Sequence, residues 1–291
     1  MKEEVQKLID QLKELIQKEG IDPEEVVRQL VPRPEPEEME IDPERIAAEE
    51  GEAQSYFFGE EVKFKPESFE PYLDQIKRCA RFGLRPHVLL PKRFEEGATY
   101  PGWRVRLERW IYSKVEEGSL PPGTLNLSPL GDRPALVMVD PRMKPNYQGG
   151  KQMYRDDELI GGILEELRRN GVIPYRRYID PKSRYAISWI ELHQFVLPEI
   201  ARAMGVRRDR IRLPRLVEFN FLSNCFYPQW YQGNTWEWFE DRVRSPIGEE
   251  CLFGGKFSFA AMATSVYTNW AEARSDRIGF RPIVILGELP G

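Results

Sequence analysis

The sequence predicts an α+β protein. Three segments have the periodicity of amphipathic helices, because apolar residues recur at three- and four-residue spacing over 2–19, 156–170 and 188–204. Two apolar runs, 135–140 and 283–286, have the length and composition of buried strands. The 291 residues are enough to bury a sizeable core in one large domain, or in one domain with an appendage.

The first 32 residues predict an N-terminal helical hairpin. Its first helix, 2–19, ends at Gly20, and Asp22 caps a second helix that has Pro23 at its first position and ends at Pro32. Either this hairpin docks on the body of the protein, or its apolar seam, which approximates two heptads, joins copies of the chain into a homo-oligomer.

The middle of the chain predicts a linker followed by an extension. Residues 33–62 are acidic and punctuated by proline, which predicts a linker with at most one helical turn. Residues 63–150 predict a mixed α/β extension packed on the body, with a helix over 69–82 and strands over 104–107 and 135–140. Prolines and glycines predict loops over 121–134.

Helix boundaries are clearer after residue 150. The helix over 156–170 is followed by Gly171 as its C-cap. Ser188 and Glu191 have the spacing of a capping box at the start of the next helix, which ends at Gly205. Beyond residue 206 the chain is rich in aromatic and turn residues, so we expect short elements there until the terminal strand.

Composition excludes several classes of protein. The chain has 42 Lys and Arg against 47 Asp and Glu, and this net charge of −5 excludes a non-specific nucleic-acid binder. No apolar run reaches the roughly 18 residues of a transmembrane helix. The charged N-terminus predicts no secretory signal, so a cytoplasmic location is the default expectation.

Cysteine and histidine content limits the chemistry. Cys79, Cys225 and Cys251 are odd in number and lack metal-ligand spacing, so we expect buried, inert thiols in a reducing compartment. Only His87 and His193 are present, which excludes a histidine-rich metal site. We therefore expect neither a metal nor another cofactor.

Five short motifs follow one another over residues 186–286. They are Ala186-Ile187-Ser188-Trp189; Arg212-Leu213-Pro214 with Glu218-Phe219; Gly233-Asn234-Thr235-Trp236-Glu237-Trp238; Gly254-Gly255; and Ile278-Gly279-Phe280-Arg281. Their order resembles the C-type-lectin fold of the formylglycine-generating-enzyme/sulfatase-modifying superfamily. The resemblance implies a C-type-lectin-like domain over 151–291, with short strands and two flanking helices.

Several motif residues have expected structural roles. Trp236 and Trp238 alternate around Glu237, so both rings are expected in a core, with Glu237 as a structural carboxylate that accepts backbone N–H bonds. Arg281 is expected to be the buried partner of a carboxylate or carbonyl, and Gly279 to let the last strand pass close to its neighbour. The expected structural scaffold is Trp236, Glu237, Trp238, Gly254, Gly255, Trp270, Gly279, Phe280 and Arg281.

The resemblance also bears on catalysis. The oxygen-dependent enzymes of the superfamily use a C-terminal cysteine pair, but neither Cys225 nor Cys251 lies between Gly255 and Gly279, where that site would be expected. The iron-dependent relatives need a histidine cluster, which two distant histidines do not supply. We therefore expect no catalytic residue. The alternative is an enzyme, or degenerate enzyme, of the formylglycine-generating type.

The segment between Gly255 and Gly279 resembles the hypervariable region of proteins that diversity-generating retroelements rewrite. This resemblance implies a non-catalytic, receptor-like protein whose segment 256–281 binds an unknown protein or cell-surface ligand. Mutagenised asparagine codons never yield Met, Trp, Glu, Gln or Lys, so Met262, Trp270 and Glu272 are expected as fixed scaffold. The expected ligand-binding positions are Phe257, Phe259, Thr264, Ser265, Tyr267, Thr268, Asn269, Ala271, Ala273, Ser275, Asp276 and Arg277.

Overall fold

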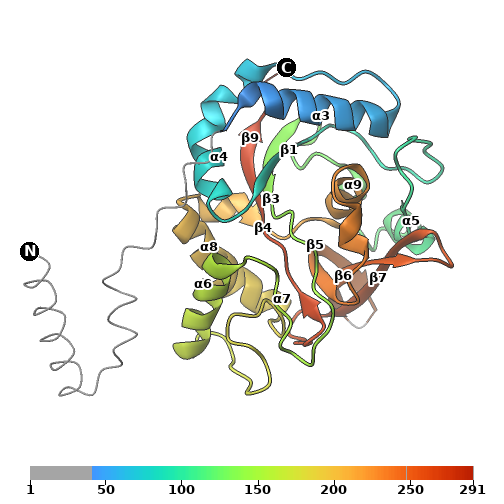
Figure 1. Ribbon diagram of the computed structural model, residues 1–291. Helices are drawn as coiled ribbons and strands as arrows, with labels where there is room; N and C mark the ends of the chain where they lie inside the picture. Colours follow the sequence, from blue (N-terminus) through green and yellow to red (C-terminus); the bar gives the residue numbers. More distant parts are fainter. Residues whose placement is uncertain (1–40, 247, 291) are drawn as a thin grey trace, which may run out of the picture. The chain divides into compact units, whose positions relative to one another are not determined.

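The computed structural model describes residues 41–246 and 248–290, so the helical hairpin expected over 1–32 lies outside the described residues. Helices dominate the first part of the described chain, and five strands, β5 to β9, follow one another at its end (Figure 1). The α-helices are α3 (Pro43–Phe58), α4 (Leu73–Ala80), α5 (Arg109–Glu116), α6 (Glu158–Arg169), α7 (Trp189–Glu191), α8 (Leu197–Met204) and α9 (Leu216–Cys225). The strands are β1 (Arg85–Leu89), β2 (Arg106–Leu107), β3 (Ala135–Val139), β4 (Ile211–Arg212), β5 (Trp236–Ser245), β6 (Gly248–Ser258), β7 (Ala263–Trp270), β8 (Ile278–Gly279) and β9 (Ile283–Glu288). The α+β class is thus confirmed.

Two sheets organise the chain. The first has the strand order β1-β3-β9-β4 and is antiparallel throughout. The second has the order β2-β7-β6-β5-β8, with an antiparallel centre and a parallel strand at each edge. Residues 63–150 supply β1, β2 and β3, so they belong to both sheets. The chain from residue 41 onward is one compact unit, and no extension separates at residue 150.

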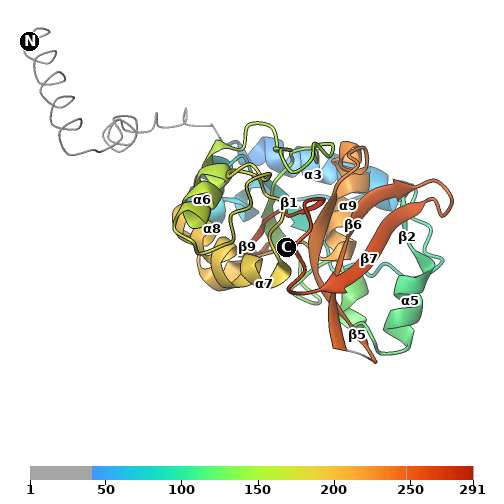
Figure 2. The same cartoon turned by 90° about the horizontal axis from the view of Figure 1, so that it is seen from below.

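The first sheet is buried on both faces. Every residue of β3 is buried, and its alternate side chains enter two different cores. Leu136 and Met138 pack with residues of α4, α6 and α8, whereas Val137 and Val139 pack with aromatic residues of α9 and β5. Figure 2 shows α6 and α8 on one side of the molecule and strands β5, β6 and β7 on the other. The continuous apolar run of β3 follows from this position between two cores.

The expectation of a linker over 33–62 is wrong from Pro43 onward. Asp42 accepts a hydrogen bond from the backbone N–H of Glu44, Pro43 occupies the first helical turn, and Gly59 ends α3 in the left-handed conformation. The buried face of α3 combines apolar with polar side chains, Glu50 and Gln54 among them, which hides it from a hydrophobicity pattern.

The expectation of short elements beyond residue 206 is also wrong. Strands β5, β6 and β7 have 10, 11 and 8 residues, and α9 has 10. The aromatic residues of this region lie both in α9 and in the strands, and those in the strands suit a pleated, half-buried surface.

Other expected boundaries are confirmed. Ser188 and Glu191 form the capping box of α7, and Gly205 ends α8 in the left-handed conformation. A π-helical segment, Leu192–Val196, joins α7 to α8. Strand β3 ends at Val139, and the terminal apolar run is β9. In the part of the chain that the structure describes, no helix combines the length and apolar character that a membrane crossing needs.

Replacement of Phe57 tests whether α3 is part of the folded unit. Phe57 is fully buried and contacts Phe94 and Phe221, so Phe57→Ala is expected to lower the free energy of unfolding by about 3–5 kcal/mol. Its neighbour Tyr56 is 63% exposed, so Tyr56→Ala is the matched control. This control should change the free energy of unfolding by less than about 0.5 kcal/mol. Urea unfolding measures both. Equal, negligible effects would show that α3 does not pack on the body.

Candidate ligand-binding site

A cluster of buried charges lies beneath the C-terminal motifs. Glu237 in β5 and Arg281 after β8 are fully buried and form an ion pair, with Arg281 Nη2 2.9 Å from Glu237 Oε1. Arg281 also donates to the backbone carbonyl of Asp140, at the end of β3. Arg184 Nη2 lies 2.7 Å from Asp140 Oδ2, and Arg184 Nε lies 2.5 Å from Asp157 Oδ2. Buried charges need such partners because desolvation is costly.

The three arginines of this cluster favour an ionised Asp140. Burial raises the pKa of Asp140, but Arg184, Arg281 and Arg142 outweigh burial and hold that pKa at about 2. Tyr154 Oη donates to Glu237 Oε1, and burial together with the Glu237 charge raises the pKa of Tyr154. The Asp140 carboxylate is therefore ionised at neutral pH and Tyr154 keeps its proton, whereas burial raises the pKa of Asp157.

The roles expected for Glu237 and Arg281 are partly correct. Arg281 is the buried partner of both a carboxylate and a carbonyl, as predicted. The expectation that Glu237 accepts backbone N–H bonds is wrong, because the guanidinium of Arg281 and the hydroxyl of Tyr154 occupy its oxygens. A guanidinium satisfies both carboxylate oxygens at once, which a single N–H cannot do.

Other motif residues also contact one another. Glu218 is fully buried and accepts from Arg212 at 2.6 and 2.7 Å, and from Arg215 at 2.8 Å. Trp238 Nε1 donates to the carbonyl of Ile187, just before the Ser188 capping box. The motifs thus form one connected framework.

The motif glycines sit where a side chain does not fit. Gly255 has a φ of 97°, and a Cβ there would lie 2.8 Å from the Phe219 ring. Gly254 lies against the backbone of Ser265 in β7. At Gly279 the nearest atoms belong to the ring of Tyr185, 3.0 Å from a Cβ, so the close neighbour is a side chain and not the adjacent strand.

An aromatic row crosses the second sheet. Trp238 is fully buried and contacts Phe253, which in turn contacts Trp236 and Tyr267 with ring centroids 6.1 and 5.6 Å apart. Tyr267 is 49% exposed. Trp236 is half-buried: it packs against the edge of the core, and Lys256 Nζ lies 3.9 Å from the centre of its ring. The row therefore connects the core to the surface.

Most expected ligand-binding positions are accessible. Their exposed and half-buried side chains, with Lys256, form what we call the β6–β7 surface: Phe257, Phe259, Tyr267, Thr268, Asn269, Ala271, Ala273, Ser275, Asp276 and Arg277. Two positions are wrong. Thr264 is fully buried, where its hydroxyl accepts from Asn220 Nδ2 at 2.8 Å, and Ser265 is 8% exposed. Both lie in the part of β7 that packs beneath the surface.

The three residues expected to stay fixed are exposed at the surface. Trp270 is 42% and Met262 56% exposed, and Glu272 is also exposed. Trp270 ends β7 opposite Glu250, and Met262 lies in the turn between β6 and β7, where no layer covers them. The remaining scaffold residue, Phe280, is fully buried as expected.

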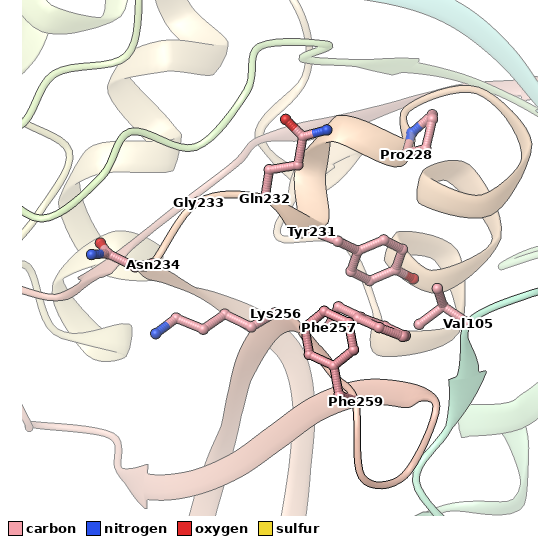
Figure 3. A pocket seen from close by; sticks show the side chains of 9 residues that line it. All are labelled: Val105, Pro228, Tyr231, Gln232, Gly233, Asn234, Lys256, Phe257 and Phe259. Carbon is pink, nitrogen blue, oxygen red and sulfur yellow. The ribbon is translucent and has the colours of Figure 1, made fainter.

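A pocket of about 600 Å³ adjoins the β6–β7 surface (Figure 3). Its walls come from the end of β6, from the segment around Pro228–Tyr231 and from the residue before β2. The lining residues are Val105, Pro228, Tyr231, Gln232, Gly233, Asn234, Lys256, Phe257 and Phe259. The sequence predicted only Phe257 and Phe259 as contacts. Gly233 and Asn234 carried a signal as motif residues, whereas Val105 lies in a region with no motif.

Lys144 supports this pocket from below. It is fully buried, and its ammonium donates to the carbonyls of Trp230 and of Gly255, at 2.6 Å for the latter. Burial lowers the pKa of Lys144 to about 7, against the opposing attraction of Glu237. Lys144 thereby ties the segment of Tyr231 to the strand of Lys256.

The thiols of the chain are poorly placed for chemistry. Burial raises the pKa of Cys79 and of Cys251 to about 12, and raises that of Cys225 as well. Within residues 41–246 and 248–290, His, Cys, Asp and Glu side chains do not gather in threes suited to a metal ion.

The depressed pKa of Lys144 gives a pH dependence. Between pH 7 and 9 the unfolded chain keeps this lysine protonated while the folded chain releases the proton, so the free energy of unfolding should rise with pH. Lys144→Met should remove this rise, and Lys151→Met, at an exposed lysine, should keep it. Urea unfolding at several pH values measures the slopes. Equal slopes in all three proteins would contradict the assignment.

Comparison with known proteins does not add to this geometry. Neither a protein-family model, a curated protein sequence nor a solved structure matches the chain. The function is therefore argued from the site itself.

Proposed function

We propose that this chain is a non-catalytic ligand-binding protein on a C-type-lectin fold, and that a diversity-generating retroelement rewrites its β6–β7 surface. One observation carries the proposal. Four of the exposed large apolar side chains lie close together in sequence, in and around the β6–β7 turn and β7: Phe259, Met262, Tyr267 and Trp270. A concentration of exposed apolar side chains in one hairpin favours an interaction role for that hairpin. The partner is an unknown protein or cell-surface ligand.

The division between surface and framework supports the proposal. The framework around residues 256–277 is fully buried. Glu237 lies in the neighbouring strand β5, and Phe280 and Arg281 follow the segment in sequence. The accessible side chains between them can change at little cost, because exposed substitutions usually alter stability by less than about 0.5 kcal/mol. Tyr267 and Phe259 offer large contact areas, as aromatic side chains do in binding loops.

The contacts among the motif residues support the C-type-lectin fold in particular. The glutamate of the Trp-Glu-Trp string pairs with the arginine of the terminal motif. The arginine and glutamate of the second motif also pair. An ordered set of motifs that meets in one buried framework is what a shared fold requires.

The enzymatic alternative has less support. A formylglycine-generating enzyme needs a reactive cysteine pair, and reactive thiols have lowered pKa values and partial exposure. Burial raises the pKa of both Cys225 and Cys251. A calcium-dependent sugar-binding lectin is a further alternative that the fold would allow. It needs a cluster of acidic ligands, and no such cluster occurs in the described part of the chain.

The coding DNA tests the proposal. We expect a near-copy of the codons for about residues 256–281 within the flanking kilobases, beside a reverse-transcriptase gene. Mismatches should fall only at adenines of the copy, and the codons of Lys256, Met262, Trp270 and Glu272 should match it. The codons of α9 serve as the control and should have no such copy. A locus without a copy would refute diversification and leave 256–277 as an ordinary surface.

A further inference from the structure

The pocket of Figure 3 has two chemically different ends. At one end, Phe257 and Phe259 meet edge to face with ring centroids 4.7 Å apart, beside Tyr231 and Val105. At the other end, Lys256 extends toward Asn234, away from the two phenylalanine rings. A volume of about 600 Å³ lies within the range of small-ligand sites, roughly 300–1,000 Å³.

The cation at the polar end has no carboxylate partner. Among the described residues, no Asp or Glu oxygen lies within 4 Å of Lys256 Nζ, which instead sits over the Trp236 ring. Burial and repulsion from Arg277 lower the pKa of Lys256. Arg277 stacks on Tyr147 at 4.2 Å, also without an ion pair in this part of the chain.

The nearby negative charge does not neutralise these cations. The carboxylate of Asp276 accepts a hydrogen bond from Tyr147 Oη at 2.9 Å. It forms no ion pair within 4 Å with Lys256 or Arg277 in the described residues. A bound anion would therefore gain the attraction of both cations and relieve their mutual repulsion.

We propose that this pocket binds an aromatic carboxylate, with the aromatic ring packed against Phe257, Phe259 and Tyr231 and the carboxylate on Lys256. This inference rests on the proposed function and names the ligand chemistry of the same surface. The three aromatic side chains favour a ring, because aromatic pairs gain from edge-to-face and offset packing. Lys256 favours a carboxylate through a charge-assisted hydrogen bond.

The walls of the pocket differ in how they would vary among diversified copies. Tyr231 and Asn234 lie outside the segment and stay constant, whereas Phe257 and Phe259 can change. The changing side chains then select the group that carries the carboxylate.

Calorimetric titration of the full chain tests the inference. The probes are 3-phenylpropionate, its neutral amide 3-phenylpropionamide, and acetyl-Gly-Phe with a free or an amidated C-terminus. 3-Phenylpropionate and the peptide with a free C-terminus both present a phenyl ring and a carboxylate. Their relative affinity distinguishes a small metabolite from a protein C-terminus. We expect both carboxylates to bind. Each amide should bind at least about tenfold more weakly than its acid, because a charge-assisted hydrogen bond is lost.

Variants separate the pocket from the rest of the protein. Lys256→Met should weaken binding of 3-phenylpropionate about tenfold, whereas the exposed control Lys151→Met should leave it unchanged. If Lys256→Met fails to fold, the comparison of acid with amide on the native chain decides. Equal binding of acid and amide, or no binding of any probe at about 10 mM, a concentration that detects weak fragments, would overturn the inference. Either result leaves the proposed function to the DNA comparison, so the two failures are distinguishable.

Discussion

The ion pair between Glu237 and Arg281 is the interaction on which the rest of the structure depends. Both side chains are fully buried, and Arg281 also reaches the Asp140 carbonyl, so the pair joins the end of β3, the start of β5 and the segment after β8. Arg184 extends the network to Asp157, before α6. Removal of one partner from such a pair typically costs about 3–5 kcal/mol, because the other charge stays buried and unpaired. The network therefore fixes how the two sheets meet.

This constraint also determines the geometry of the candidate site. The Arg281 guanidinium lies over the Trp230 ring at 3.9 Å, and the Trp230 carbonyl accepts from Lys144. Lys144 in turn holds the Gly255 carbonyl, next to Lys256. The pocket wall is thus connected to the buried charges by direct contacts. The most exposed side chains of the β6–β7 surface, such as Phe259, lie at the outer end of these contacts, so they can serve recognition at little cost to the fold.

The sequence predicted those features that depend on local chemistry. The Ser188–Glu191 capping box, the buried strands β3 and β9, and the pairing of Arg281 follow from spacing, apolar runs and the cost of a buried charge. It did not predict α3, whose buried face includes Glu50 and Gln54, partners for His87 and for the backbone of Val88. It also missed the burial of Thr264, which is set by Asn220 in a different element. Such long-range partners decide burial, and a pattern within one segment does not contain them. The pocket was missed for the same reason, since Val105 and Tyr231 are about 125 residues apart.

Thermal and urea unfolding of single alanine variants across residues 256–281 tests the central claim most directly, namely that a buried framework carries a surface free to vary. The account predicts changes within about 0.5 kcal/mol at the exposed Phe259 and Arg277, and losses of about 3–5 kcal/mol at Arg281. Thr264→Ala should cost about 1–3 kcal/mol, because Asn220 loses its buried acceptor. Losses at Phe259 and Arg277 as large as the loss at Arg281 would contradict the account.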